Sequence, residues 1–185
     1  MILDSKEYIL KNGYKIMVKS PEVDDAYKLL DNIITVAEST DYLLSVPKDY
    51  ERFVDDIEKE KTLIRKYREG KDYLLAVYLN DTIIGNSSLN FLNHVKDSHR
   101  AKVGIAIQKE YWGLGIGTIL FNEMIDISKN TTGIDQVELG VISENERAIS
   151  LYKKMGFVKV ATIPRHLKLS DGKYLDEDIM VLFLK

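Results

Sequence analysis

The sequence predicts an α+β protein of the broad α/β class, with a mixed, largely antiparallel sheet of about seven strands flanked by about four helices. Short apolar segments rich in β-branched residues recur along the chain, amphipathic helical stripes interrupt them in mixed order, and hairpin turns separate some neighbours. Internal repeats and low-complexity linkers are not found. We therefore expect a single domain over residues 1–185, with residues 1–13 as a leader or an extra strand.

The first half of the chain reads as one strand, two helices and a hairpin. Ser20-Pro21-Glu22 is typical of a helix start, with Ser20 as the cap, and Gly70 is a typical helix stop. Asn80-Asp81 is typical of a hairpin turn. We expect a strand over 14–18, a helix over 20–34, a loop over 40–47, a helix over 49–69, and strands over 73–79 and 82–92.

The second half alternates strands and helices before ending in another hairpin. A polar interval over 94–100 separates the first hairpin from a buried strand, and Asp171-Gly172 marks the second turn. We expect strands over 103–107, 136–141, 157–163 and 174–184, with helices after Thr118 and after Ser143.

Three alternate glycines, Gly113, Gly115 and Gly117, lie between an apolar strand and a helix. At such a helix start the first amides have no intrahelical partner and the dipole is positive, so a diphosphate can approach the backbone closely. A lone glycine-rich turn is nevertheless a weak signal, because glycine also serves ordinary turns. A dinucleotide site, with Glu138 on the ribose, is a poorer alternative because the spacing is G-x-G-x-G.

The helix predicted after Ser143 has typical start and stop residues in the sequence. Ser143 and Glu146 form a capping-box pattern, Asn145 is an alternative cap, and Gly156 suits the stop position. Tyr152 falls on the apolar face of this helix, so by periodicity alone it is a core aromatic with its hydroxyl at the rim.

Together the glycine-rich turn and the pattern N-x-x-A-x-x-L-Y-x-x-x-G-F, which ends at Phe157, resemble the GNAT superfamily of N-acetyltransferases, which use acetyl-coenzyme A. The resemblance implies that Asn145 contacts the coenzyme and that Tyr152 lies beside its sulfur as the general acid. Trp112 stands where Gln or Arg is commonest, which removes one side-chain contact but leaves the main-chain cradle. The implied coenzyme-binding residues are Ile105, Ala106 and Ile107 for the pantetheine arm, and Trp112, Gly113, Leu114, Gly115, Ile116, Gly117 and Thr118 for the pyrophosphate.

Amide formation requires a neutral amine, so a proton must be removed from an amine whose reference pKa is about 10.4. The chain has no cysteine, which excludes acetyl relay through a thiol and favours direct attack. Backbone amides near Ile107 are placed to stabilise the oxyanion that forms. The proton-accepting group stays open among His94, His99, Glu38, Asp176 and a water chain.

The net charge of −3 and the dispersed basic residues argue against nucleic acid as a partner, and the charge run over 58–61 reads as the solvated face of a helix. No membrane-spanning run, signal peptide or metal site is expected, which favours a cytoplasmic protein. The expected acceptor is a small-molecule amine of amino-acid or polyamine type, with Glu38, Asp41 and Tyr42 as contacts by analogy. A protein N-terminus, a non-catalytic acyl-coenzyme A-binding module and a homodimer stay open.

Overall fold

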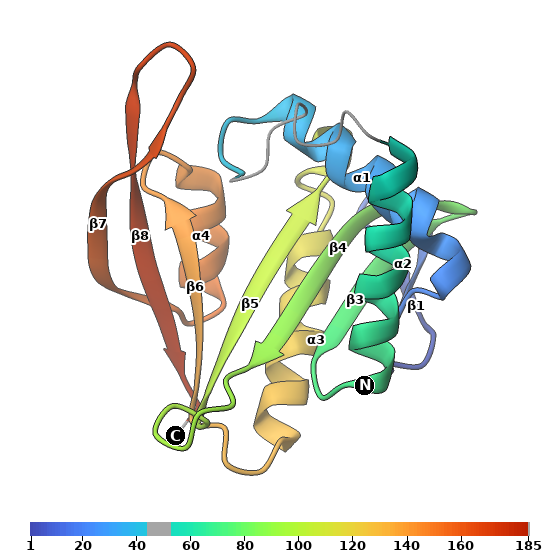
Figure 1. Cartoon of the computed structure of the whole chain (residues 1–185), viewed down its shortest axis with the longest axis horizontal. Coiled ribbons are helices and arrows are strands. Elements are labelled where there is room, and N and C mark those ends of the chain that lie inside the picture. Colours follow the sequence, from blue (N-terminus) through green and yellow to red (C-terminus); the bar gives the residue numbers. More distant parts are fainter. Residues whose placement is uncertain (44–52, 185) are drawn as a thin grey trace. The chain divides into compact units, whose positions relative to one another are not determined.

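The computed structural model describes residues 1–43 and 53–184 and divides into two compact units (Figure 1). Unit 1 comprises residues 1–90 and 104–120, and unit 2 comprises residues 91–103 and 121–185. Two strands and one helix contribute residues to both units: β4 (Thr82–Phe91), β5 (Arg100–Ile107) and α3 (Ile116–Asn130). Each unit is described by itself below.

Unit 1 contains the strand order β1-β2-β3-β4-β5. The first three neighbouring pairs are antiparallel, and Asn80 takes a positive φ of 55° in the tight turn between β3 and β4. Along β2 the alternation predicted from the sequence is confirmed, because Ile16 and Val18 are buried between more exposed neighbours. The bounds are β1 Lys6–Ile9, β2 Lys15–Lys19, β3 Tyr73–Leu79 and β4 Thr82–Phe91.

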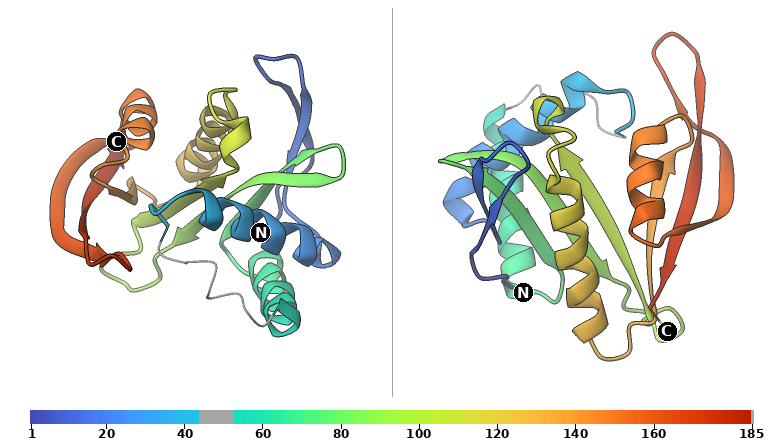
Figure 2. Two further views of the ribbon diagram at one scale, coloured as in Figure 1. Left: turned by 90° about the horizontal axis from the view of Figure 1, so that it is seen from above. Right: turned by 180° about the vertical axis from the view of Figure 1, so that it is seen from behind.

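Two helices, α1 (Ala26–Ser39) and α2 (Phe53–Glu69), lie on the same face of these strands (Figure 2). Their apolar stripes meet the strand side chains in one buried cluster that includes Leu29, Ile64 and Leu74. A short 3₁₀ turn, Val23–Asp25, precedes α1.

The expected cap at Ser20 is wrong. Glu22 is the residue that caps the 3₁₀ turn, and the Ser20 hydroxyl instead accepts a hydrogen bond from the Leu3 amide at 3.0 Å. Ser20 therefore ties the N-terminal segment to the start of this region, which the local pattern around Pro21 could not indicate.

The register of β4 against β5 is set by two hydrogen bonds at the ends of the pair. Leu92 N donates to Arg100 O at 3.0 Å in unit 2, and Gln108 N donates to Ile84 O at 3.1 Å in unit 1. The bonded residues run in opposite order and are equally spaced on both strands, so the pair is antiparallel without a bulge. The even-numbered residues of β5 thus bond towards β4, and Ile105 and Ile107 direct their backbone groups to the other edge.

Unit 2 contains the strand order β5-β6-β8-β7. The β5–β6 pairing is parallel and runs from Arg100 to Lys102, whereas β6–β8 and β8–β7 are antiparallel. Helix α4 packs on one face of these strands, and the edge strand β7 is exposed along most of its length (Figure 2). The bounds are β6 Gln136–Ile142, α4 Glu146–Lys154, β7 Val158–Lys168 and β8 Tyr174–Phe183.

The predicted mixed, mostly antiparallel sheet with four α-helices is confirmed, with eight strands in the described residues. The eighth strand is β1, which lies in the 1–13 segment. β5 begins at Arg100, three residues before the predicted start, and β7 continues to Lys168 beyond the predicted end at residue 163. The predicted start of the second helix at residue 49 and residues 44–47 of the predicted 40–47 loop lie outside the described residues.

Candidate functional site

The glycine-rich turn lies in unit 1 between a 3₁₀ turn, Lys109–Tyr111, and helix α3. Gly113 and Gly115 have positive φ values of 79° and 104°, which a residue with a Cβ adopts only with strain. A Cβ added at either glycine would meet no atom within 4 Å, so open space lies above the turn. Glycine is needed here for the backbone path and not to relieve a clash.

Six consecutive backbone N–H groups, from Gly113 to Thr118, donate to no acceptor in the part of the chain that the structure describes. The next amide, that of Ile119, donates to Gly115 O at 3.1 Å and begins the helical ladder. Free amides at the positive end of a helix dipole attract an anion, and two phosphates need several donors. The turn therefore has the donors and the open space that a pyrophosphate requires.

Trp112 anchors this turn to β5. Its indole Nε1 donates to the Ile107 carbonyl at 2.7 Å, and Leu114 O accepts from the Lys11 amide at 3.3 Å. The resemblance placed Trp112 among the pyrophosphate-binding residues, without the side-chain contact to phosphate that Gln or Arg would make. The structure gives the indole a positioning role that the motif does not predict.

The edge of β5 beside the turn carries backbone groups that point away from β4. By the register above, Ile105 offers its N–H and C=O on this edge and Ile107 offers its N–H, while the Ile107 carbonyl is taken by Trp112. The recorded β5–β6 ladder ends at Lys102. Ala106 bonds towards β4, so its backbone is the least available of the three predicted pantetheine contacts.

In unit 2 the start of α4 differs from the capping-box prediction. Asn145 is the cap, and its Oδ1 accepts from the Ala148 amide at 3.2 Å. The Ser143 hydroxyl instead donates to Asp178 Oδ1 at 2.7 Å. The capping role of Ser143 is therefore wrong, and the alternative cap at Asn145 is confirmed.

Tyr152 lies in the aromatic core of unit 2 and is only 7% exposed. Its ring meets Phe121 edge-on, with 5.2 Å between centroids, and lies 6.2 Å from Phe157. Burial raises the pKa of the Tyr152 hydroxyl to about 12, so it keeps its proton at neutral pH. Among the described residues this hydroxyl has no recorded hydrogen-bond partner.

The candidate bases and acceptor contacts are scattered. His94 is exposed in the turn after β4, and the Asp176 carboxylate accepts the Arg165 amide at 2.7 Å, both within unit 2. In unit 1 the predicted acceptor contacts are exposed near the end of α1: Glu38, Asp41 and Tyr42. Within the described part of unit 1, no recorded hydrogen bond or ion pair joins these three residues to the glycine turn.

Glu138 is not available for a ribose. It is only 7% exposed, forms an ion pair with Arg100, and has Lys102 Nζ at 3.5 Å from its carboxylate. The sheet is also mostly antiparallel, whereas a dinucleotide fold needs a parallel one. The dinucleotide alternative is therefore wrong.

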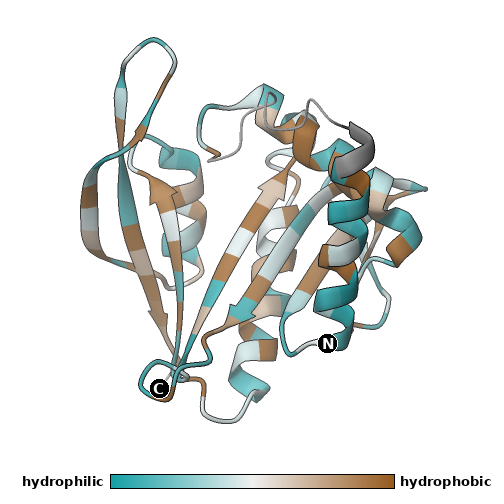
Figure 3. Ribbon diagram, viewed as in Figure 1, coloured by the Kyte–Doolittle hydropathy of each residue, from teal (hydrophilic) through white to brown (hydrophobic). Residues whose placement is uncertain are grey.

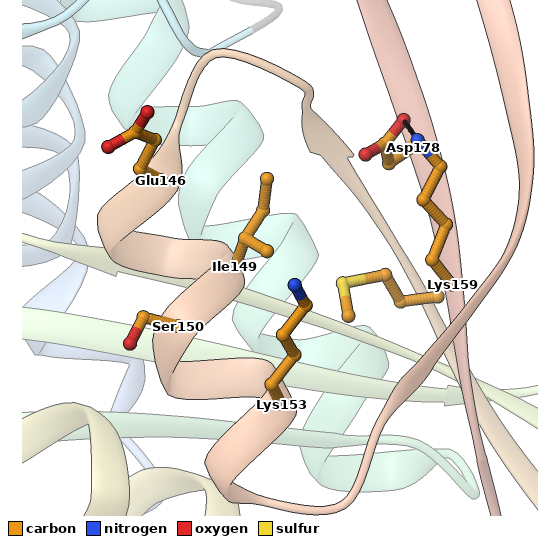
Figure 4. Close-up of a pocket in the computed structure, with 7 residues that line it drawn as sticks. Glu146, Ile149, Ser150, Lys153, Lys159 and Asp178 are labelled. Atoms are coloured by element: carbon orange, nitrogen blue, oxygen red, sulfur yellow. Dashed lines mark ion pairs between the residues drawn. The ribbon is translucent and has the colours of Figure 1, made fainter.

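A pocket of about 450 Å³ lies in unit 2 between α4 and the β7–β8 pair (Figure 4). Asp178 is buried at the edge of this pocket, and its Oδ1 forms an ion pair with Lys159 Nζ at 2.7 Å. The Lys153 side chain points into the pocket. At 100° per residue, this face of α4 differs from the face that carries Asn145 and Tyr152. The lining residues are Glu146, Ile149, Ser150, Lys153, Lys159, Asp178 and Met180.

A polar row on β4 was not predicted from the sequence. Asn86, Ser88 and Asn90 alternate along a strand that is otherwise largely buried, and the middle of β4 is visibly less hydrophobic than its neighbours (Figure 3). Tyr67 on α2 donates to Asn90 Oδ1 at 2.8 Å. The N-x-S-x-N pattern is visible in the sequence and was the available signal.

In the described ranges, no helix combines the length and the apolar character needed to cross a membrane. The same ranges contain no group of three or more side chains arranged to hold a metal ion.

The family model for the acetyltransferase (GNAT) family matches residues 37–157. The chain is similar to the L-amino acid N-acetyltransferase AaaT of Escherichia coli, with 28% identity over 102 residues, covering 55% of this chain and 62% of that enzyme. The matched stretches span between 24% and 62% of the first curated relatives.

Two solved structures share the fold. A GNAT-family acetyltransferase from Streptococcus pneumoniae superposes with a TM-score of 0.82 at 24% identity, covering 91% of this chain and 99% of that one. The structure of yncA from Salmonella typhimurium, solved with its cofactor acetyl-CoA, superposes with a TM-score of 0.75 at 19% identity, covering 92% of this chain and 94% of that one. By the family model, which spans most of its length and both sequence motifs, this chain belongs to the acetyltransferase (GNAT) family.

Proposed function

We propose that the protein is an acetyl-coenzyme A-dependent N-acetyltransferase that acetylates a primary amine of a small molecule. The observation that carries the proposal is the run of six unpaired amides from Gly113 to Thr118 in a member of this family. Two further findings support it: the open space above Gly113 and Gly115, and the similarity to a structure solved with acetyl-CoA.

The residues present suit acetyl-coenzyme A. The amides of residues 113–118 would hold its pyrophosphate, and the free backbone groups of Ile105 and Ile107 would hydrogen-bond its pantetheine amides as an added strand would. Trp112 would act through Ile107 by keeping the turn aligned with β5. When bound, the coenzyme supplies an acetyl group activated as a thioester.

The protein's own residues contribute binding, orientation and a proton. Tyr152 is the proposed general acid: a tyrosine hydroxyl carries a proton at neutral pH, and burial raises the pKa of this one further, to about 12. Asn145 orders the start of α4, the helix that carries Tyr152, and is a proposed coenzyme contact. Transfer is direct, since the chain has no cysteine to carry the acetyl group.

The acceptor is proposed to be a small amine of amino-acid or polyamine type. The similarity to an enzyme named for L-amino acids supports the first type, and the mild acidic excess of the chain suits a cationic acceptor. Acetylation of a protein N-terminus is the alternative that the same chemistry allows.

The test is release of coenzyme A, measured with a thiol reagent, across a panel of amino acids, polyamines and N-terminal peptides. Release that depends on one of the small amines supports the proposal. Release with peptides alone would move the acceptor to a protein N-terminus. Tight acetyl-coenzyme A binding without release for any acceptor would instead favour a non-catalytic binding module.

A further inference from the structure

Three buried oxygen atoms of unit 1 have no hydrogen-bond partner in the described part of the chain. They are Asn32 Oδ1 on α1, and Asp56 Oδ2 and Glu60 Oε2 on α2. Asn32 is 0% exposed and Asp56 is 5% exposed. A buried polar atom left unpaired is destabilising, so three on two neighbouring helices require an explanation.

The two carboxylates lie on the face of α2 that packs on the sheet. Asp56, Glu60, Ile64 and Tyr67 follow one another at spacings of four, four and three residues, which places them on one side of a helix. Ile64 is fully buried in the cluster against β3, and Tyr67 packs against the same cluster. The expectation that residues 58–61 form a solvated face is therefore wrong for Glu60, although it holds for Glu58.

The polar row of β4 faces these helices. Asn86 pairs with Ala76 and Ser88 pairs with Leu74, and both β3 residues belong to the same buried cluster. Asn32 Nδ2 donates to Asn86 Oδ1 at 2.8 Å. The other helix reaches the row through Tyr67, whose hydroxyl donates to Asn90.

Topology brings the unpaired atoms to the same stretch of this row. Three residues join α2 to β3, so α2 runs antiparallel to β3 and in the direction of β4. Glu60 precedes Tyr67 by about 10 Å of helix, and Asn86 precedes Asn90 by about 13 Å of strand. Glu60 therefore lies alongside the Ser88–Asn86 stretch, where Asn32 is bonded.

All three unpaired atoms are acceptors, and the described part of unit 1 contains no buried unpaired side-chain donor to match them. In the described part of unit 1, Lys59 Nζ contacts Asp56 Oδ1 at 2.8 Å, and Asp56 Oδ2 stays unpaired. Burial, together with the Asp56 charge, raises the pKa of Glu60. A group that supplies N–H donors and positive charge, as an ammonium does and a carboxylate does not, would satisfy these oxygens.

We propose that the α1–α2 face of β4 binds a second ammonium group of the acceptor, so that the preferred substrate is a diamine or polyamine and not an α-amino acid. This inference rests on the proposed acetyl transfer. The row lies next to the strand proposed to hold the coenzyme arm, because a Cβ added at Gly104 of β5 would lie 3.4 Å from Ser88 Oγ. One amine of the substrate would react at that edge while the other is held by Glu60, Asp56 and Asn32.

The test compares 1,4-diaminobutane with n-butylamine, which has the same chain length and lacks the second ammonium. We expect kcat/KM to be at least tenfold higher for the diamine, mainly through a lower KM. Glu60→Gln should remove most of this preference by raising KM for the diamine and leaving n-butylamine unchanged. Glu58→Gln is the matched control, because Glu58 is exposed on the same helix and pairs only with Lys61 among the recorded contacts.

A binding measurement supports the kinetics. Calorimetry on protein saturated with coenzyme A should detect 1,4-diaminobutane in the wild type and in Glu58→Gln, and much weaker binding in Glu60→Gln. If Glu60→Gln does not fold, Asp56→Asn takes its place with the same expected loss.

The outcomes separate this inference from the proposed function. Turnover of both amines with equal kcat/KM, or a preference for L-alanine over the diamine, would overturn the inference and leave acetyl transfer intact. A diamine preference that survives in both Glu60→Gln and Asp56→Asn would also overturn it. Failure to bind acetyl-coenzyme A at all would remove the proposed function itself.

Discussion

Replacing Gly115 by alanine should weaken acetyl-coenzyme A binding without filling the binding space. Gly115 has a φ of 104°, and a Cβ added there meets no atom within 4 Å, so the substitution introduces backbone strain alone. A residue with a Cβ in this conformation costs about 1–2 kcal/mol. We expect the free turn to relax this strain by rotating its amides, which the bound turn could do only by losing hydrogen bonds to the pyrophosphate.

The strain then appears in the binding free energy. With 1.4 kcal/mol per factor of ten, we expect the dissociation constant for acetyl-coenzyme A to rise about 5- to 30-fold, measured by isothermal titration calorimetry. The matched control is Gly172→Ala in the β7–β8 hairpin, where φ is 90° and an added Cβ again meets nothing within 4 Å. This variant should lower the melting temperature and leave the dissociation constant unchanged.

Two results would contradict this expectation. A Gly115→Ala protein with wild-type affinity would show that the amides of the turn do not grip the coenzyme. An equal loss of affinity in Gly172→Ala would show that the effect is global destabilisation and not a change in the turn.

Tyr152→Phe should lower kcat by about 10²- to 10⁴-fold with little change in the melting temperature, because the ring contacts stay and the hydroxyl has no recorded partner to lose. Tyr78→Phe is its control, because the Tyr78 hydroxyl donates a hydrogen bond to Asp25 Oδ2 at 2.7 Å. This variant should keep the wild-type kcat and lose about 1–2 kcal/mol of unfolding free energy, measured by urea denaturation. Asn145→Ala should cost about 1 kcal/mol of unfolding free energy through loss of the α4 cap, and a proposed coenzyme contact predicts a raised KM for acetyl-coenzyme A as well. Burial raises the pKa of Asp178, but hydrogen bonds from Lys159, Ser143 and Thr162 outweigh burial and lower this pKa below its ordinary value of 3.8. The carboxylate therefore stabilises the fold at neutral pH and ceases to do so as the pH falls through its folded pKa. In an acid titration, Asp178→Asn should lose less stability than the wild type.

Most of the fold could be predicted because its signals are local. The alternation along β2, the hairpin residues Asn80 and Asp81, and the glycines of the turn each act within a few residues. The strand ends were less predictable, as for Arg100, because pairing with Gln136 of β6 extends β5 beyond its apolar run.

The caps at Ser20 and Ser143 show where local patterns fail. Both residues have the hydroxyl that a cap needs, but tertiary partners, the Leu3 amide and the Asp178 carboxylate, take those hydroxyls instead. A sequence pattern does not show which distant group will compete for a side chain.

The candidate site, like the fold, could be predicted from the sequence only in part. The motif indicated the glycine turn and Tyr152, because the family pattern fixes their spacing along the chain. It could not indicate the unpaired oxygens of Asn32 and Glu60, since these lie on separate helices and become a common feature only when α1 and α2 pack on β4. Glu60 in particular looks like part of a solvated charge run until its helix is placed.

The proposed function depends on the amides from Gly113 to Thr118 binding the pyrophosphate of acetyl-coenzyme A. The most direct measurement is the ¹H–¹⁵N correlation spectrum of the protein titrated with acetyl-coenzyme A and, separately, with S-acetyl-pantetheine, which lacks the pyrophosphate. We predict large shifts of these six amide signals with the coenzyme and small ones with the truncated compound. Unchanged amide signals in this turn at saturating acetyl-coenzyme A would contradict the account.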